Sequence, residues 1–114
     1  MSNCIFCKIA DGEIPADKVY EDASILAFKD IQPQAPLHIV IIPKKHIETL
    51  NDVSETDARL LSDLVFTCQK LAKEQKIAEK GYRVVVNCNR DGGQAVFHLH
   101  AHLLGGRKMS WPPG

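Results

Sequence analysis

Short apolar runs separated by turn residues divide the first half of the chain into strands. Residues 18–21 and 25–29 are two such runs, and Asp22-Ala23-Ser24 between them is typical of a tight turn. A loop is expected at residues 31–36, because its two prolines cannot join a regular ladder. The β-branched run at residues 38–42 then predicts a third strand.

Two further segments predict helices. Residues 4–10 suit a short helical turn closed by Asp11-Gly12. The one long helix is expected to begin at Ser54, because Asp57 three residues later resembles a capping box, and to stop near Gly81. Helical spacing gives this helix one apolar stripe, which consists of Ala58, Leu61, Leu64, Val65, Cys68, Leu71 and Ala72.

The last third of the chain predicts two more strands, at residues 82–88 and 96–104, joined by a tight turn at residues 89–93. Consecutive strands joined by short turns are antiparallel. We therefore expect an α+β fold in a single domain over residues 1–114. Its five strands would form an antiparallel meander, with one main helix on one sheet face and a short N-terminal helix.

Three histidines alternate with apolar residues in the last expected strand. Side chains alternate between the two faces of a strand, so His98, His100 and His102 should share the face that the long helix leaves uncovered. Three interpretations are open: incidental surface histidines, a metal site, or nucleophilic catalysis in which one imidazole attacks and the others handle protons. Packing alone does not explain such a row, so it predicts a functional site.

Composition narrows the possible ligands. The 114 residues carry fourteen basic and fourteen acidic side chains, so no broad positive field is available to track a nucleic acid polymer. No run reaches the ~18 apolar residues of a membrane span, and Met1 to Cys4 lack the basic-then-apolar pattern of a signal peptide. We therefore expect a cytoplasmic protein without membrane contact that binds a small ligand.

Two smaller motifs bear on the chemistry. Asp91-Gly92-Gly93-Gln94 precedes the histidine strand, and its glycines would let backbone N–H groups approach an oxyanion, which suggests phosphoryl chemistry; a plain hairpin turn is the alternative. Cys4 and Cys7 form a C-x-x-C pair. Half of a metal site and a pair of inert thiols are both open, whereas redox catalysis would want the pair after a strand.

Taken together, the motifs resemble a known family. His98-Leu99-His100-Ala101-His102-Leu103-Leu104 is similar to the signature of the histidine triad (HIT) nucleotide-binding family. Further segments resemble its Hint branch in the same order, namely Asp30 to His38, Ile42 to His46, Val85-Val86-Asn87, Gly92-Gly93-Gln94, Gly105-Gly106-Arg107 and Trp111 to Gly114. The resemblance covers nearly the whole chain.

The resemblance implies a homodimer with a ten-stranded sheet shared between two subunits. It also implies that the protein binds purine nucleoside monophosphates and, with no organic cofactor, hydrolyses adenosine (purine nucleoside) 5'-phosphoramidates to AMP and an amine. His100 would attack the α-phosphorus and form a nucleotidyl-histidine. His102 would contact the phosphate and help to protonate the amine, while His98 and His38 would support the orientation of His100.

Substrate contacts follow from the same resemblance. Asp30 would bind the ribose hydroxyls, Asn87 would hydrogen-bond near the phosphate, and Trp111 would reach the partner subunit's active site. The purine slot would consist of Ile5, Phe6, Ile9, Phe28 and Ile31. The remaining substrate-binding residues would be Gly93, Gln94, Ala95 and Val96.

Two features set this chain apart. Ala95 stands where the family usually has Ser or Thr, so a non-catalytic nucleotide-binding regulatory module is the main alternative to an enzyme. The C-x-x-C pair resembles that of HIT proteins with a structural zinc, whose ligands here would be Cys4, Cys7, His46 and His98. A zinc-dependent hydrolase that uses the imidazoles as ligands is a third alternative.

Overall fold

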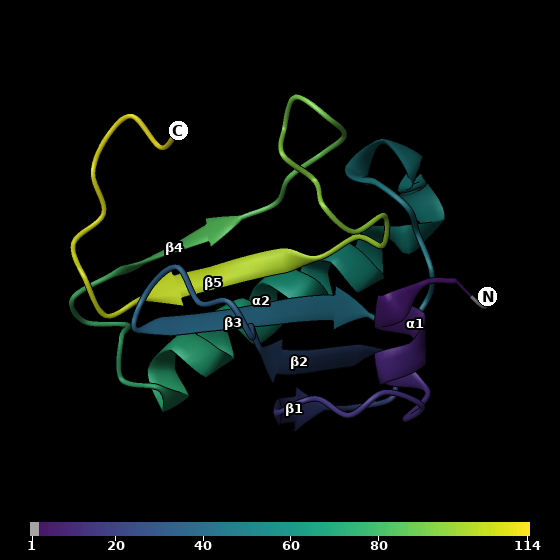
Figure 1. Ribbon diagram of the computed structural model, residues 1–114, viewed down its shortest axis with the longest axis horizontal. Coiled ribbons are helices and arrows are strands. Elements are labelled where there is room, and N and C mark those ends of the chain that lie inside the picture. Colours follow the sequence, from purple (N-terminus) through teal and green to yellow (C-terminus); the bar gives the residue numbers. More distant parts are fainter. Residues whose placement is uncertain (1–2) are drawn as a thin grey trace.

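The computed structural model describes residues 3–114. Met1 and Ser2, the first two residues of the segment that lacks a signal-peptide pattern, lie outside the described residues. Five strands form one antiparallel sheet, with the long helix on one face and the short helix near one end of the other (Figure 1). The strands are β1 (Lys18–Glu21), β2 (Ile25–Lys29), β3 (Leu37–Pro43), β4 (Tyr82–Val85) and β5 (Ala101–Gly105). The helices are α1 (Ile5–Ala10) and α2 (Ala58–Glu74), and two short 3-10 turns are η1 (Leu50–Asp52) and η2 (Glu55–Asp57).

The first three strands lie where the sequence predicts them. Asp22 closes the turn between β1 and β2, because its Oδ1 accepts the N–H groups of Ser24 and Ile25, both at 2.8 Å. The pairing of β2 with β3 is regular and antiparallel from Ile25 opposite Pro43 to Lys29 opposite Ile39. The predicted hairpin and third strand are therefore confirmed.

The order of the strands differs from the expected meander. The order is β1-β2-β3-β5-β4, so the last strand lies between β3 and β4. Ala101 and Leu103 of β5 are almost fully buried, whereas β4 alternates exposed and half-buried residues. A strand whose apolar residues are completely buried gains most from neighbours on both sides, and β4 becomes the edge.

Helix α2 covers the sheet face that carries alternate residues of β2, β3 and β5. The core between them contains Ile25, Ala27, Ile39, Ile41, Leu64, Cys68, Leu71, Ala72, Ala101 and Leu103. Burial of one Leu or Ile side chain of this kind stabilises the fold by roughly 1.5–3 kcal/mol. This cluster is the larger of the two cores and fixes the sheet on which the histidines are mounted.

Three expectations about the long helix are only partly met. Ser54 and Asp57 do form a capping contact, Ser54 N–H to Asp57 Oδ2 at 3.2 Å, but they cap η2, and α2 begins at Ala58. The chain leaves the helix at Lys76, which adopts a positive φ of 63°, and not at Gly81. Val65 was placed on the apolar stripe, yet its side chain is 62% exposed.

The sequence predicts that the second sheet face is uncovered, but helix α1 covers part of it. Phe6 and Ile9 of α1 pack there on Leu26, Phe28, Val40 and Ile42. The short N-terminal helix, in purple at one end of the sheet in Figure 1, therefore closes one side of the face that carries the histidines.

The histidine strand is shorter than predicted. Strand β5 begins at Ala101, so residues 96–100 lie outside the ladder, and the pairing with β3 ends at Ile41 opposite Ala101. Before that point the Leu99 N–H donates to the Ile47 carbonyl at 2.6 Å, a partner in the segment after β3. Only His102 lies in the strand, so the predicted strand is too long. The three imidazoles nevertheless lie on the side of the sheet that α1 covers, as their alternation predicts, because the Phe6 ring centroid lies 5.9 Å from that of His98 and the His100 and His102 ring centroids are 4.9 Å apart.

Along the described residues, no helix combines the length and the apolar character needed to cross a membrane.

Candidate active site and metal site

His100 is held by a backbone carbonyl. Its Nδ1 lies 2.7 Å from the His98 carbonyl oxygen, and its ring is only 5% exposed. A carbonyl oxygen can only accept, so Nδ1 carries the proton and donates it. In the neutral ring, Nε2 is then left with a free lone pair, which is the atom a nucleophilic imidazole needs.

His102 and His38 form a second arrangement of ring nitrogens. The Gln34 N–H donates to His38 Nδ1 at 3.0 Å, so the proton of neutral His38 is on Nε2. That Nε2 lies 2.9 Å from His102 Nδ1 and 3.4 Å from Asp30 Oδ2. His38 therefore donates to His102, and neutral His102 carries its own proton on Nε2.

Burial keeps these rings neutral. It lowers the pKa of His100, although the His98 carbonyl and Asp30 oppose the shift. Burial, with smaller effects from His100 and His38, lowers the pKa of His102 to about 4, and burial also lowers that of His38 against the attraction of Asp30. Desolvation disfavours the imidazolium form, so at pH 7 the site offers one free ring lone pair and one N–H donor side by side. The rings of His100 and His102 have centroids 4.9 Å apart.

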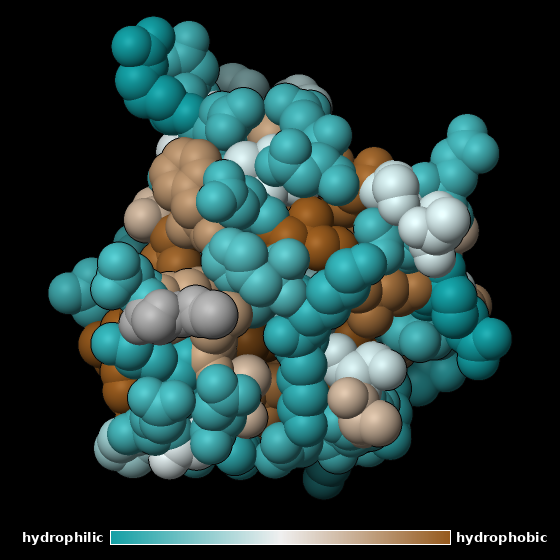
Figure 2. Space-filling model, turned by 90° about the vertical axis from the view of Figure 1, so that its right-hand side faces the viewer, coloured by the Kyte–Doolittle hydropathy of each residue, from teal (hydrophilic) through white to brown (hydrophobic). Residues whose placement is uncertain are grey.

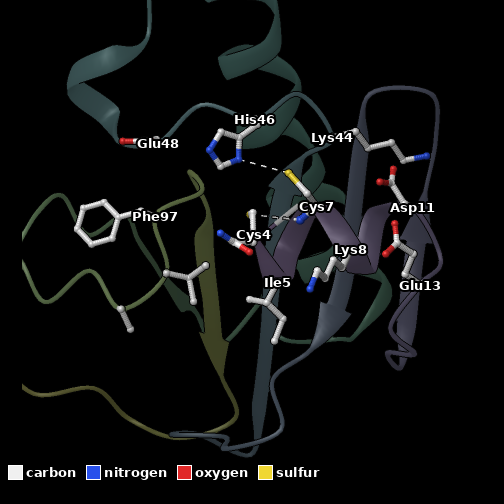
Figure 3. Close-up of a pocket in the computed structure, with 13 residues that line it drawn as sticks. Cys4, Ile5, Cys7, Lys8, Asp11, Glu13, Lys44, His46, Glu48 and Phe97 are labelled. Atoms are coloured by element: carbon white, nitrogen blue, oxygen red, sulfur yellow. Dashed lines mark hydrogen bonds between the residues drawn. The ribbon is translucent and has the colours of Figure 1, made fainter. Parts of the chain in front are cut away.

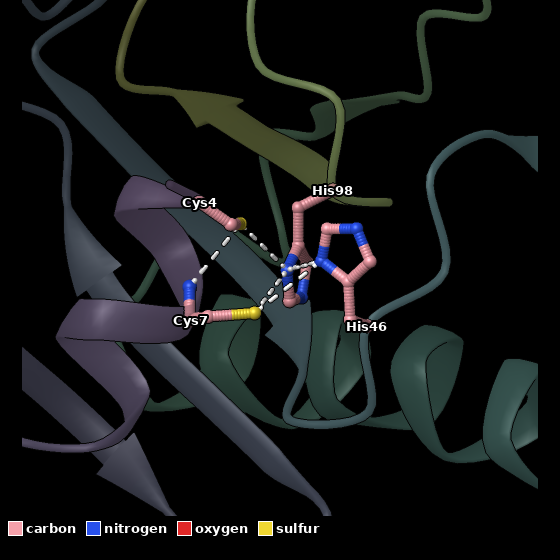
Figure 4. Close-up of side chains that lie close together, drawn as sticks. All are labelled: Cys4, Cys7, His46 and His98. Carbon is pink, nitrogen blue, oxygen red and sulfur yellow. Dashed lines mark hydrogen bonds between the residues drawn. The ribbon is translucent and has the colours of Figure 1, made fainter. Parts of the chain in front are cut away.

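His98 faces a different site. Its ring is fully buried, and Nε2 lies 2.7 Å from the Pro43 carbonyl oxygen, so Nε2 donates and Nδ1 has the lone pair. Nδ1 is 3.3 Å from Cys4 Sγ, 3.5 Å from Cys7 Sγ and 3.2 Å from His46 Nδ1. The four side chains converge from α1, the segment after β3 and the segment before β5 (Figure 4).

The spacing of these four ligand atoms suits a tetrahedral metal ion. Zinc at ~2.3 Å from sulfur and ~2.0 Å from nitrogen would separate ligand atoms by roughly 3.3–3.7 Å. All four atoms lie within 4.8 Å of one another, and Cys7 Sγ is 3.3 Å from His46 Nδ1. The residues predicted from the resemblance are brought together, and the cluster could hold a metal ion.

The surroundings of Cys7 disfavour its thiolate. Burial, followed by the hydrogen bond and charge of Cys4, raises the pKa of the Cys7 thiol to about 11. A bound divalent ion would reverse that effect, because it stabilises the thiolate.

A second group of possible ligands, Asp30, His38 and His102, is less suited to a metal. His38 would have to bind through Nε2, but its Nδ1 already accepts the Gln34 N–H. A neutral imidazole must keep one proton, so both nitrogens cannot act as acceptors together. This hydrogen bond argues against a zinc-dependent hydrolase that uses the imidazoles as ligands.

Comparison with known proteins agrees with this geometry. The HIT domain family matches residues 11–109. The chain belongs to the HIT family. It is a hydrolase of that family. It is 51% identical over 105 residues to the purine nucleoside phosphoramidase of Escherichia coli K12, which covers 92% of this chain and 88% of that protein.

Other relatives of this HIT protein match over nearly their whole length. An uncharacterized HIT-like protein of Synechococcus elongatus is 51% identical over 110 residues, 96% of each chain. The crystal structure of a HIT family hydrolase from Legionella pneumophila matches with a TM-score of 0.97 and 60% identity, covering 98% of this chain and 100% of that one. A histidine triad protein from Clostridium difficile matches with a TM-score of 0.94 and 48% identity, over 96% of each chain.

The apolar residues assigned to the purine slot of the HIT protein divide into two groups. Phe6, Ile9 and Phe28 are buried, and the Phe6 ring lies edge-on to the rings of His100 and Phe28 at 5.0 and 5.5 Å. Ile5 is 46% exposed and Ile31 is 95% exposed, so these two are free to contact a ligand. The end of the molecule that carries α1 shows apolar side chains in the gaps between hydrophilic ones (Figure 2).

The glycine turn has a larger structural role than the sequence suggested. A Cβ on Gly92 would lie 2.5 Å from the Cys88 carbonyl, so this glycine allows the chain to pack on itself. The Asn87 side chain donates to the Gly92 carbonyl at 2.6 Å, and the buried Gln94 side chain accepts from the Asn89 N–H. Gly93 has a positive φ of 80°, which favours glycine.

Ala95 and Val96 lie beside the metal-ligand cluster. They line one wide, open pocket together with Cys4, Cys7 and His46 (Figure 3). Val96 also packs against the core that contains Phe6. The Trp111 side chain is 81% exposed, and the tail that carries it is tied to β4 by Arg83, which donates to the Ser110 carbonyl at 2.9 Å.

Sequence reasoning missed the backbone groups that fix the rings. The carbonyls of Pro43 and His98 and the N–H of Gln34 decide which nitrogen of each histidine carries the proton. Because any residue type presents these groups, no pattern of side chains could have identified them.

Proposed function

We propose that this HIT protein cleaves the P–N bond of adenosine (purine nucleoside) 5'-phosphoramidates and releases AMP and an amine. The observation that carries the proposal is the hydrogen bond from His100 Nδ1 to the His98 carbonyl, which leaves a nucleophilic Nε2 beside the N–H donor of His102. The Escherichia coli relative named purine nucleoside phosphoramidase supports this substrate class.

In the first half-reaction, His100 Nε2 forms a bond to phosphorus while the P–N bond breaks. The departing nitrogen takes up one proton from solvent, and the neutral His102 ring assists by donating a hydrogen bond from its Nε2–H to the departing nitrogen or the phosphate. In the second half-reaction, water attacks phosphorus, the histidine–phosphorus bond breaks, and a proton of the attacking water returns to solvent, which balances the one taken up by the amine. Two smaller barriers replace one large one, and a neutral imidazole needs no strong base to attack.

The remaining site residues would bind the nucleotide. Asp30, 3.4 Å from His38, would accept the ribose hydroxyls, and Ile31 and Phe6 would contact the purine. Asn87 would contribute near the phosphate, with Gly93 and Gln94 shaping the turn beside it. His98 would act through its carbonyl on His100 and not as a base.

Zinc is the ion that we assign to Cys4, Cys7, His46 and His98. Two thiolates and two imidazoles are a usual tetrahedral zinc set with no position left for water. Bound zinc would supply structural cross-linking between α1 and the segments after β3 and before β5. Its role would therefore be stability and not hydrolysis.

We further infer that two copies associate through β4. This strand is the edge of the sheet and has β5 as its only partner among the described residues, and unpaired edges favour pairing with another strand. Apolar side chains are exposed on β4, just beyond it and on α2, namely Tyr82, Val84, Val86, Val65 and Phe66. Pairing of two β4 strands would give a ten-stranded sheet and would place Trp111 near the partner subunit. Light scattering should give twice the 12.7 kDa chain mass at micromolar concentration; a single-chain mass would contradict this arrangement.

The direct test of function is turnover of adenosine 5'-phosphoramidate, with AMP followed by chromatography. The proposal predicts steady release of AMP that His100→Asn abolishes. Tight AMP binding with no turnover by the wild-type protein would favour the regulatory module instead.

A further inference from the structure

The loop that carries Gln34 is held by the segment that follows β5. Arg107 Nη2 donates to the Gln34 carbonyl at 3.1 Å. Gly106, with a φ of 92°, lies so close to Pro36 that a Cβ would be 2.8 Å from the Pro36 Cβ. The Gly106-Arg107 segment therefore packs on the same loop at two points. Gln34 is exposed, and the arginine contact restrains its carbonyl, which lies in the peptide unit that follows the Gln34 N–H.

Gln34 in turn decides the form of two histidines through its N–H, which is joined to the restrained carbonyl at the Gln34 Cα. Its N–H donates to His38 Nδ1, which leaves the proton on His38 Nε2, and His38 then donates to His102 Nδ1. Loss of the Gln34 contact would let His38 carry its proton on either nitrogen. His102 could then place its proton on Nδ1, and its Nε2 would become an acceptor that repels phosphoryl oxygens.

We propose that Arg107 is a positioning residue for His102: it holds the Gln34 carbonyl, and thereby keeps His102 in the form that carries its proton on Nε2. The effect on turnover rests on the proposed function, whereas the effect on the ring proton does not. The end of β5 connects His102 to Arg107 along the chain. The hydrogen bonds from Arg107 to Gln34, from Gln34 to His38 and from His38 to His102 therefore lead from the end of β5 through the loop and back to the strand.

The position of the ring proton can be measured directly. In holoprotein labelled with 15N-histidine, long-range proton–nitrogen spectra at pH 7 distinguish a protonated from an unprotonated ring nitrogen, and His102→Asn assigns the signals. We expect wild-type His102 to be protonated on Nε2 alone. In Arg107→Gln, the two His102 nitrogens should shift toward each other, because both forms become populated.

Turnover provides the second readout. Arg107→Gln should lower kcat on adenosine 5'-phosphoramidate by about three- to tenfold, as expected for one exposed, charge-assisted hydrogen bond. The Kd for AMP should stay within about twofold, because the contact does not touch the nucleotide site directly. Arg107→Lys, which can still donate to the carbonyl, should recover most of both signals.

Arg59→Gln is the matched control. This arginine is also exposed and pairs with Asp63 on its own helix, so its loss should change neither the spectrum nor kcat. Protonation of wild-type His102 on Nδ1, or a wild-type spectrum in Arg107→Gln, would overturn the proposal. Expected spectra in a protein that releases no AMP would instead count against the proposed function and leave the Arg107 assignment standing.

Discussion

His98 and His100 are two residues apart, yet they belong to different sites. His98 donates from Nε2 to the Pro43 carbonyl and turns the lone pair of Nδ1 toward two thiols and His46. His100 donates from Nδ1 to the His98 carbonyl and keeps its lone pair on Nε2, beside His102. Two identical side chains in one motif thus suit the two different roles that we propose, a metal ligand and a nucleophile.

The difference shows that backbone acceptors, more than the motif, assign the chemistry of each ring. Both rings are buried, and burial lowers the pKa of both, so neither the exposure nor the direction of the pKa shift separates them. What separates them is the ring nitrogen that meets a carbonyl. Each of the following predictions changes one side of this comparison and leaves the other intact.

The largest effect is expected at His100. His100→Asn should lower kcat by about three orders of magnitude or more, because it removes the attacking nitrogen, while AMP still binds. Single-turnover kinetics and AMP titration measure the two effects separately. Near wild-type turnover would end this mechanism.

On the other side of the comparison, Cys4→Ser should remove a zinc ligand. We expect about one zinc per chain in wild-type protein, and a melting temperature lower by on the order of 10 °C in the variant. Elemental analysis and thermal unfolding are the measurements. Cys88→Ser, which alters a thiol outside the cluster, should keep both the zinc and the melting temperature. A zinc-free wild-type protein, with Cys4→Ser unfolding at the same temperature, would exclude the site.

These two clusters also mark the limit of what the sequence could predict. The C-x-x-C pair alone predicted only half of a metal site, and the resemblance to zinc-containing HIT proteins supplied His46 and His98, which lie far away in the sequence. The alternation of the three histidines was predictable, but the extent of their strand was not, because residues 96–100 leave the ladder and the Leu99 N–H donates to the Ile47 carbonyl. Local patterns likewise predicted the β1–β2 hairpin, whereas the insertion of β5 between β3 and β4 depends on long-range burial that no local pattern contains.

A smaller effect is expected on the dependence of stability on pH. The pKa of His102 falls from about 6.5 in the unfolded chain to about 4 in the folded one, chiefly through burial. Between those values the unfolded state binds a proton that the folded state does not, so the free energy of unfolding should decrease as pH falls from 6.5 to 4 and then level off. Urea unfolding at several pH values measures the slope. His102→Asn should show a shallower slope, and an equal slope would contradict this role of His102.

The smallest effect concerns the hydroxyl that this chain lacks. Ala95→Ser should raise kcat/KM on adenosine 5'-phosphoramidate several-fold, because one added hydrogen bond to the phosphate or departing group contributes about 0.5–1.5 kcal/mol. Ala95 is exposed beside the metal-ligand pocket, so the added hydroxyl should not disturb the fold. An unchanged or lower kcat/KM would show that residue 95 does not limit the reaction.

The central claim is that His100 alone of the five histidines becomes covalently bonded to phosphorus. Rapid quenching of the protein with an adenosine phosphoramidate, followed by peptide mass spectrometry, tests it most directly. If His100 is the nucleophile, we expect an adenylyl group on His100 during turnover and none on His98 or His46. An adenylyl group on another histidine, or rapid turnover with no labelled protein at any time, would contradict it.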